Sequence, residues 1–103
     1  MYHDILVPTD GSDASQTATD HALVLSSRLE GTLHALSVSE SPGAMQRDQL
    51  RADAEDEARS AVEAVEAAAT EAGVEVHTAV REGTPDEEIL AYADHAGVDL
   101  IVV

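Results

Sequence analysis

The chain is 103 residues long, which suits one small domain, and it combines 21 acidic residues with five arginines and no lysine, for a formal net charge of −16. That charge argues against nucleic acids and anionic membranes as partners, because an acidic surface repels both. Cysteine is absent, which excludes disulfides, thiolate metal sites and cysteine nucleophiles.

An acidic surface without lysine is typical of proteins from salt-loving organisms, where concentrated salt screens the repulsion between like charges. No stretch reaches the roughly 18 consecutive apolar residues of a membrane-spanning helix. Met1 leads directly into a strand-like run, with no signal peptide. We therefore expect a halophilic, cytoplasmic protein.

Residues 5–7, Ile-Leu-Val, predict a strand that Pro8 stops. The Thr-Asp-Gly-Ser turn at 9–12 is rich in helix-capping side chains and predicts a helix that runs to about Leu29. Gly31 is expected to supply the left-handed residue that ends this helix. A strand thus feeds directly into a helix at the start of the chain.

A second strand is predicted over 32–38, where residues on both faces are apolar or nearly so, as a central parallel strand requires. The Ser-Pro-Gly content of 39–47 predicts a loop, and an apolar stripe then predicts a long helix that ends at Gly73. A third strand is predicted over 74–80. Its Val and Thr residues alternate with polar ones, which indicates a half-exposed strand at a sheet edge.

The clearest helix start lies at Thr84, Pro85 and Glu87. These residues occupy the preferred positions for a capping hydroxyl, a first-turn proline and a capping-box glutamate. The helix is expected to end at Gly97. The nearly continuous apolar run at 98–103 then predicts a fourth, buried strand.

The alternation of strands and helices predicts an α/β fold, an open parallel sheet with helices on both faces and right-handed crossovers. The natural strand order is 3-2-1-4, as in Rossmann-like folds, so the first and fourth strands are neighbours. A crevice should open at their carboxyl ends, where we expect the functional site. The outer edge of the fourth strand would be unpaired. This predicts either that residues 1–103 form one domain truncated at its C-terminus, or that a partner completes the sheet.

Three stretches resemble the universal stress protein family, in the right order and spacing. They are the Asp-Ile-Leu-Val-Pro-Thr-Asp-Gly-Ser run at 4–12, the strand at 33–38, and the segment that leads from Gly-Thr-Pro at 83–85 to the strand at 97–103. The resemblance to these UspA-like proteins covers essentially the whole chain. It implies the adenine nucleotide alpha hydrolase-like variant of the fold, with the family's last helix and strand missing from this sequence.

In ATP-binding members of the family, the aspartate after the first strand and the backbone near the end of the second hold the ribose and the adenine. Carried over to this chain, the resemblance implies a nucleotide site built by Pro8, Thr9, Asp10 and Ala35. An acidic side chain can accept hydrogen bonds from ribose hydroxyls, and strand backbone can pair with an adenine edge. The alternative role of Asp10 is that of a plain helix cap.

The resemblance further implies a stress-response or regulatory protein that binds adenine nucleotides, with ATP as ligand, Mg²⁺ accompanying it, and a homodimer as the assembly. The family's glycine signature, Gly-x-x-Gly followed later by Gly-Ser or Gly-Thr, is absent from this sequence. Backbone amides of such a loop cradle phosphates, so weak or no ATP binding is expected of this chain alone. The alternative function is an interaction or dimerisation module of the same fold that binds no nucleotide.

The five histidines show no pair at a metal-ligand spacing, so no metal site is predicted. His34, in a buried strand, is expected to be a satisfied core histidine, and His21 is expected to lie on a helix surface. Ser12, Ser15 and His21 lack both a nucleophile elbow and a third partner, so no catalytic residue is predicted. At most, slow ATP hydrolysis is expected of the intact protein.

Asp10 and Asp13 permit two interpretations. They could hold Mg²⁺ through water beside nucleotide phosphates, because this cation prefers hard oxygen ligands. Alternatively, they stabilise the positive end of the helix dipole from the first turn of the helix.

Overall fold

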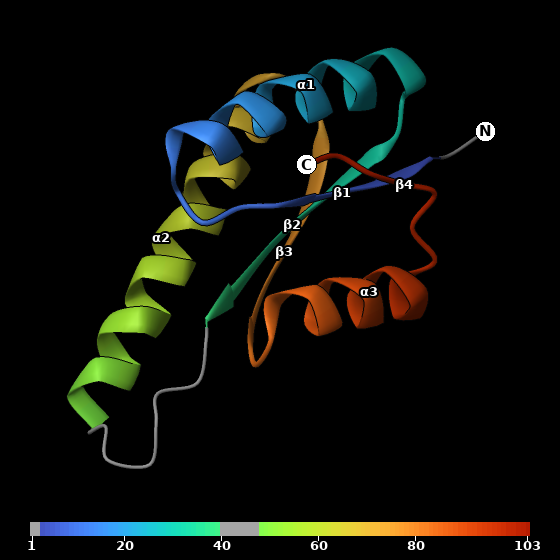
Figure 1. Cartoon of the computed structure of the whole chain (residues 1–103). Coiled ribbons are helices and arrows are strands. Elements are labelled where there is room, and N and C mark those ends of the chain that lie inside the picture. The colour runs from blue at the N-terminus through green and yellow to red at the C-terminus, as the bar shows by residue number, and fades with distance from the viewer. Residues whose placement is uncertain (1–2, 40–47) are drawn as a thin grey trace.

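The computed structural model describes residues 3–39 and 48–103, apart from the side chains of 48–52. Within these residues, four parallel strands form one sheet in the order β3-β2-β1-β4, and three helices connect them (Figure 1). The predicted fold class and strand order are therefore confirmed. In chain order the elements are β1 (Asp4–Pro8), α1 (Asp13–Leu29), β2 (Thr32–Ser39), α2 (Asp48–Glu71), β3 (Glu75–Glu82), α3 (Pro85–Ala96) and β4 (Leu100–Ile101).

The predicted loop at 39–47 lies outside the described residues, except for Ser39, which ends β2. Among the helices that the structure describes, none is both long and apolar enough to cross a membrane.

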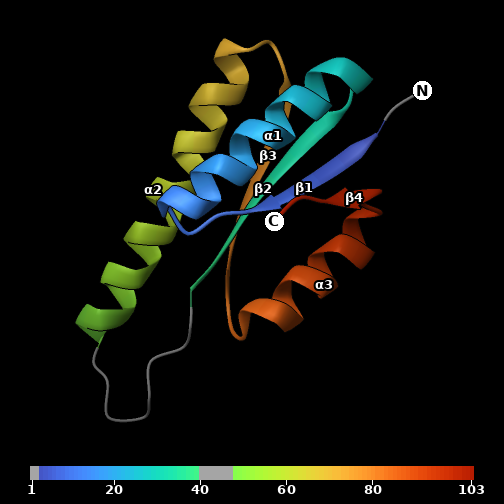
Figure 2. The ribbon, with the colours of Figure 1, turned by 45° about the horizontal axis from the view of Figure 1, so that its top comes forward.

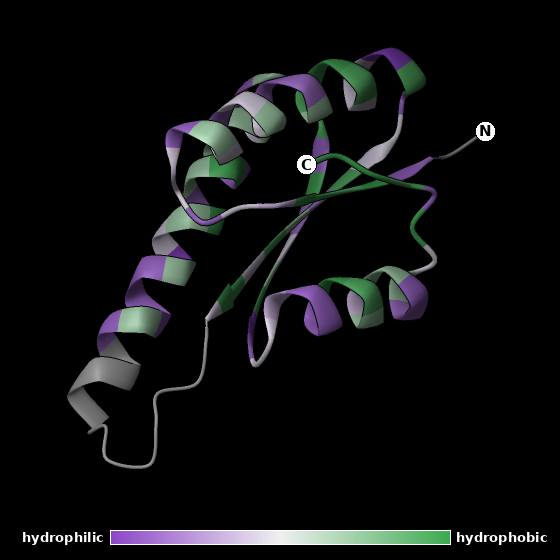
Figure 3. Ribbon diagram, viewed as in Figure 1, coloured by the Kyte–Doolittle hydropathy of each residue, from purple (hydrophilic) through white to green (hydrophobic). Residues whose placement is uncertain are grey.

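Helices α1 and α2 cover one face of the sheet, and α3 covers the other (Figure 2). The division follows from the alternation of side chains along each strand. Ile5 and Val7 of β1 pack into the core beneath α1 and α2, whereas Leu6 packs with Tyr92 of α3. All three β1 side chains are fully buried. Apolar residues accordingly concentrate along the strands, while the helices carry most of the polar ones (Figure 3).

The left-handed residue that follows α1 differs from the prediction. Glu30, and not Gly31, adopts the left-handed conformation, with φ at 53°. The helix itself ends at Leu29, as predicted, and the Glu30 amide that follows it already satisfies the carbonyl groups of Ser26 and Ser27. Gly31 is needed for a close approach instead, since a Cβ at this position would collide with the carbonyl oxygen of His3.

The start of α3 is correctly predicted, but its capping hydroxyl is not. Pro85 occupies the first turn as expected, and Thr84 is the N-cap residue, yet the Thr84 side chain makes no capping hydrogen bond. Thr84 is exposed, so water can satisfy its hydroxyl. The first turn of α3 is acidic at 86–88, and these charges favour the helix start through the helix dipole.

Strand β4 is shorter and more exposed than predicted. Regular pairing with β1 is confined to Leu100 and Ile101. Val98 instead donates its amide to the Ala93 carbonyl at the end of α3. Leu100 is 44% exposed and Val103 is 93% exposed, because β1 is the only described strand that pairs with β4.

Strand β3 is the half-exposed edge strand that the sequence predicts. It pairs only with β2 among the described strands, and Glu75 and His77 are exposed. The strand begins one residue later than predicted and continues two residues farther, to Glu82.

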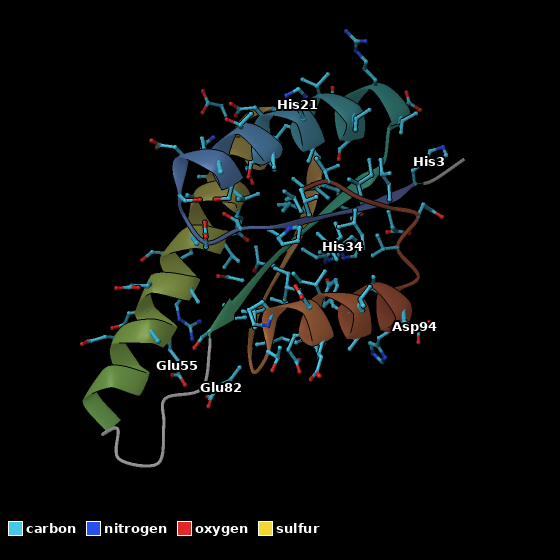
Figure 4. All side chains as sticks on the ribbon, in the orientation of Figure 1. His3, His21, His34, Glu55, Glu82 and Asp94 are labelled. Atoms are coloured by element: carbon cyan, nitrogen blue, oxygen red, sulfur yellow. The ribbon has the colours of Figure 1, made fainter. Side chains whose placement is uncertain are left out.

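A hydrogen-bonded chain of three side chains links α3 to the sheet. His34 of β2 lies between the sheet and α3 (Figure 4). Its Nδ1 is 2.8 Å from the Tyr92 hydroxyl, and its Nε2 is 2.9 Å from Oδ1 of Asp4. A carboxylate only accepts, so Nε2–H donates to Asp4 while, in the neutral ring, Nδ1 accepts from Tyr92. His34 is thus the satisfied core histidine that the sequence predicts.

Burial and the charge of Arg81 act in opposite directions on the pKa of Tyr92. Burial raises the pKa of Tyr92 above its ordinary value, although the positive charge of Arg81 opposes this change. The Arg81 guanidinium lies over the Tyr92 ring, 5.4 Å from its centroid. The hydroxyl therefore remains protonated at neutral pH and able to donate to His34.

Removing this hydroxyl should destabilise the fold. We expect Tyr92→Phe to lower the free energy of unfolding by about 1–3 kcal/mol, because it leaves Nδ1 of buried His34 without its donor. Urea denaturation monitored by circular dichroism measures the change. The matched control is Thr78→Val, which removes a hydroxyl from an exposed position of β3 and should change stability by less than about 0.5 kcal/mol. Equal stability of wild type and Tyr92→Phe would contradict the role assigned to the network.

Candidate functional site

A pocket of about 380 Å³ lies at the carboxyl ends of β1 and β2, beside the first turns of α1 and α3. This is the edge of the sheet at which the sequence predicts a crevice. The parallel neighbour of β1 on its other side is β4, also as predicted. The last residue of the chain, Val103, contributes to the rim of the pocket.

The apolar walls of the pocket come from three elements. Pro8 ends β1, Leu36 and Val38 lie on β2, and Pro85 and Ile89 lie in the first turns of α3. Side chains alternate along β2, so Leu36 and Val38 both point toward the α3 side of the sheet. The register of the sheet pairs Pro8 with Leu36, which brings the two strand ends level with each other.

The polar rim of the pocket is the turn between β1 and α1. The Thr9 amide extends the pairing with β2 by donating to the Leu36 carbonyl at 2.8 Å. The buried Thr9 hydroxyl accepts from the Gly11 amide at 3.3 Å and lies 3.2 Å from the Ser15 hydroxyl. The Ser12 hydroxyl accepts from the Ser15 amide at 3.2 Å and so caps α1. The turn is therefore held in one shape by its own side chains.

Asp10 is exposed at the tip of this turn, and Oδ1 of its carboxylate accepts from the Ser12 amide at 2.9 Å. The N-cap of α1 is Ser12, so Asp10 ties the turn together ahead of the helix and is not itself the cap. Hydrogen bonds from the Ser12 side chain, the Ser12 amide and the Ser15 side chain lower the pKa of Asp10 below its ordinary value. Asp10 thus presents an ionised carboxylate at the mouth of the pocket.

The structure brings together three of the four residues predicted to bind a nucleotide. Pro8, Thr9 and Asp10 all line the pocket. Ala35 is not among the described lining residues, because its side chain is fully buried on the opposite face of the sheet, beneath α1 and α2. The sequence analysis did not select Leu36, although strand alternation places it one residue along and on the pocket side. Other lining residues that it did not assign to the site are Ser12, Ala14, Ser15, Val38, Pro85, Ile89 and Val103.

A second pocket, of about 500 Å³, lies on the α2 side of the same turn. It shares Thr9, Asp10 and Ser15 with the first pocket. Its far wall is part of α2 and includes the exposed carboxylates of Asp56 and Glu57. No feature of the sequence predicted this pocket, because it depends on how closely α2 packs beside α1.

The described residues contain no group of three or more His, Cys, Asp or Glu side chains that could hold a metal ion. Asp13 lies in the first turn of α1, where a negative charge stabilises the helix dipole. His21 is exposed on α1, as predicted.

Comparison with known proteins gives a consistent family assignment. Residues 1–103 match the profile of the Universal stress protein family. The chain is 31% identical to Universal stress protein MJ0531 of Methanocaldococcus jannaschii, over all of this chain and 64% of that protein. It is also 31% identical to Universal stress protein YxiE of Bacillus subtilis, over all of this chain and 78% of that protein. The chain thus spans a little under two thirds of the length of the M. jannaschii relative.

Solved structures show the same fold. A universal stress protein family member from Burkholderia pseudomallei superposes with a TM-score of 0.87 at 26% identity, over 97% of this chain and 79% of that one. A universal stress protein in complex with cAMP has a TM-score of 0.75 at 24% identity, over 98% and 75% of the two chains. An AMP-bound family protein from Arabidopsis thaliana has a TM-score of 0.77 at 17% identity, over 98% and 76%. With a strand order of 3-2-1-4 and a family match along its whole length, this chain belongs to the universal stress protein family.

Proposed function

We propose that this chain is an adenine-nucleotide-responsive stress or regulatory protein that binds the adenine and ribose of its ligand in the pocket at the carboxyl ends of β1 and β2. The observation that carries the proposal is an ionised Asp10 carboxylate at the mouth of an apolar pocket of about 380 Å³. Small-molecule sites typically have this form, a volume of roughly 300–1,000 Å³, mostly apolar walls and a few fixed polar groups.

The apolar walls suit a flat base. Leu36 and Val38 form one wall from β2, and Ile89 faces them from α3. Both Val38 and Ile89 are only partly buried, so they keep surface that a ligand could cover. Covering apolar surface stabilises a complex by roughly 25 cal/mol per Å².

Asp10 suits a ribose. A carboxylate offers about four acceptor positions, so the hydrogen bond from the Ser12 amide leaves capacity for ribose hydroxyls. That same hydrogen bond holds the carboxylate in place before a ligand arrives, which reduces the ordering cost of binding. Pro8 and Thr9 position the turn that carries it. Ala35 remains a prediction for a backbone contact.

Two proteins of the same fold support the choice of ligand, since one was solved with cAMP and the other with AMP. ATP is the ligand that the family resemblance implies, and its adenosine part would meet the same residues. A magnesium ion would arrive with the phosphates, because the described residues do not form a metal site of their own. The predicted homodimer, the cytoplasmic location and the halophilic origin remain predictions.

Loss of the Asp10 carboxylate should weaken binding. We expect the protein to bind adenosine and AMP in 1 M salt, and Asp10→Ala to weaken both by roughly tenfold or more, the effect of one hydrogen bond to a charged group. Isothermal titration calorimetry measures the affinities.

The matched control is Asp94→Ala, an exposed aspartate at the C-terminal end of α3, away from the first turns that line the pocket (Figure 4). Asp94→Ala should bind as the wild type does. No heat with either ligand on the folded wild type would instead favour the alternative, an interaction module of the same fold that binds no nucleotide.

The ionisation of Asp10 gives a separate prediction. Its pKa is lowered by folding, so the charged form stabilises the native state above the ordinary pKa of 3.8, and this contribution is lost as pH falls through the lower, folded value. We expect the Asp10 carboxyl carbon to titrate below 3.8 in the folded protein by NMR, and adenosine affinity to stay constant between about pH 8 and pH 5. Ser12→Ala should move the midpoint upward, because the Ser12 side chain is the largest cause of the shift. A midpoint at or above 3.8 in the wild type would contradict this account.

A further inference from the structure

We infer that a separate ligand site lies on the α2 side of the sheet, and that it takes a small primary amine in its ammonium form. The site is a cavity of about 170 Å³ at the carboxyl end of β2, which we call the serine cavity. Its polar side chains are those of Asp10, Ser37, Ser39 and Glu57. The site is distinct from the proposed nucleoside pocket, which lies on the α3 side of the same strand end.

Two serine side chains face the serine cavity from β2. Side chains alternate along the strand, so Ser37 and Ser39 point to the same face as Ala35, beneath the helical layer of α1 and α2. Ser37 is only 4% exposed and Ser39 only 7%. Within the part of the chain that the structure describes, neither hydroxyl has a hydrogen-bond partner. Buried polar groups are as a rule hydrogen-bonded, so these hydroxyls indicate a polar occupant of the cavity.

The charge of the serine cavity selects a cation. Asp10 lines it from the turn after β1, and Glu57 lines it from α2. Lys, Arg and His are absent from its described lining, so no positive side chain there offsets the two carboxylates. The formal net charge of −16 adds a field of the same sign. An anion would be repelled by both carboxylates, whereas a cation would be attracted by both.

The other walls of the cavity favour an organic cation over a metal ion. They are the apolar side chains of Val38 on β2 and of Ala54 and Ala58 on α2. The described residues form no group of three or more His, Cys, Asp or Glu side chains that could hold a metal. An alkyl stem suits the apolar walls, and the three N–H groups of an ammonium suit the hydroxyl and carboxylate acceptors. Aliphatic primary amines carry this charge at neutral pH, as the lysine side chain does.

A series of butyl compounds tests the inference with the full 103-residue chain. The probes are n-butylamine, butan-1-ol and butyltrimethylammonium, which share one alkyl stem and differ in charge and in N–H donors. Each is titrated at neutral pH into isotope-labelled protein, and the amide chemical shifts of Ser37 and Glu57 are followed by NMR. We expect n-butylamine to bind with a Kd of roughly 1 mM, and the other two probes to bind about tenfold more weakly or not at all.

Removing the buried hydroxyl should weaken amine binding. We expect Ser37→Ala to raise the Kd of n-butylamine by about threefold to tenfold, the effect of one hydrogen bond. The matched control is Ser26→Ala on α1. Ser26 is 1% exposed and its hydroxyl also lacks a partner, but it is not in the described lining of any of the three cavities. Ser26→Ala should therefore bind the amine as the wild type does, with circular dichroism confirming the fold of both variants.

A variant at an exposed position tests the charge without disturbing the core. Glu57 is exposed on α2, and Glu57→Gln should raise the Kd of n-butylamine by about threefold. The matched control is Glu71→Gln at the end of α2, which removes an exposed charge about 21 Å along the helix from Glu57. This distance is about two Debye lengths at about 0.1 M salt, so the control should bind the amine as the wild type does.

The outcomes separate this site from the proposed nucleoside pocket. Failure of n-butylamine to bind the folded wild type, equally tight binding of butan-1-ol, or an unchanged Kd in both Ser37→Ala and Glu57→Gln would overturn the amine site. Neither Ser37 nor Glu57 is in the described lining of the nucleoside pocket, so both variants should bind adenosine as the wild type does. Amine binding by a protein that does not bind adenosine would support this site and overturn the proposed function alone.

Discussion

The architecture depends on the position of β1 between β2 and β4. All three strands are parallel, and Ile5, Leu6 and Val7 are buried completely between the two helical layers. The crossover from β1 to β2 passes through α1 on one face, while the crossover into β4 comes from α3 on the other (Figure 2). The carboxyl end of β1 is therefore the point where the connections diverge, and a parallel sheet leaves room for a ligand at such a point.

Helix α3 connects the core to the site. Near its C-terminal half, Tyr92 joins His34 and Asp4 in a hydrogen-bonded chain, which fixes the helix against the sheet through directional contacts. Near its start, Ile89 and Pro85 form part of the pocket wall. One helix carries both features, so the buried network holds the same helix that forms this part of the pocket wall. The apolar core on the α3 side of the sheet is small, so these directional hydrogen bonds fix the position of α3 more closely than apolar contacts alone would.

The charged side chains around the site are carboxylates. The turn after β1 resembles many phosphate-binding turns in its place at a helix start, but its exposed tip is the Asp10 carboxylate. Asp56 and Glu57 of α2 add two more negative charges on the α2 side of the turn. The charged side chains in the described linings of the two pockets are thus all carboxylates. The geometry of the fold and the charge around its pockets are therefore separate properties, set by different residues.

The sequence by itself determined the element order, the parallel sheet and the turn that carries Pro8, Thr9 and Asp10, because apolar periodicity and capping residues act locally. It misplaced features that depend on contacts between distant segments. Whether the left-handed residue is Glu30 or Gly31 depends on which amide bonds to the last carbonyl groups of α1. The length of β4 depends on its pairing with β1. The tertiary structure alone decided which β2 side chains line the pocket and that α2 brings its carboxylates to the far side of the turn, because both follow from register and helix packing across the sheet.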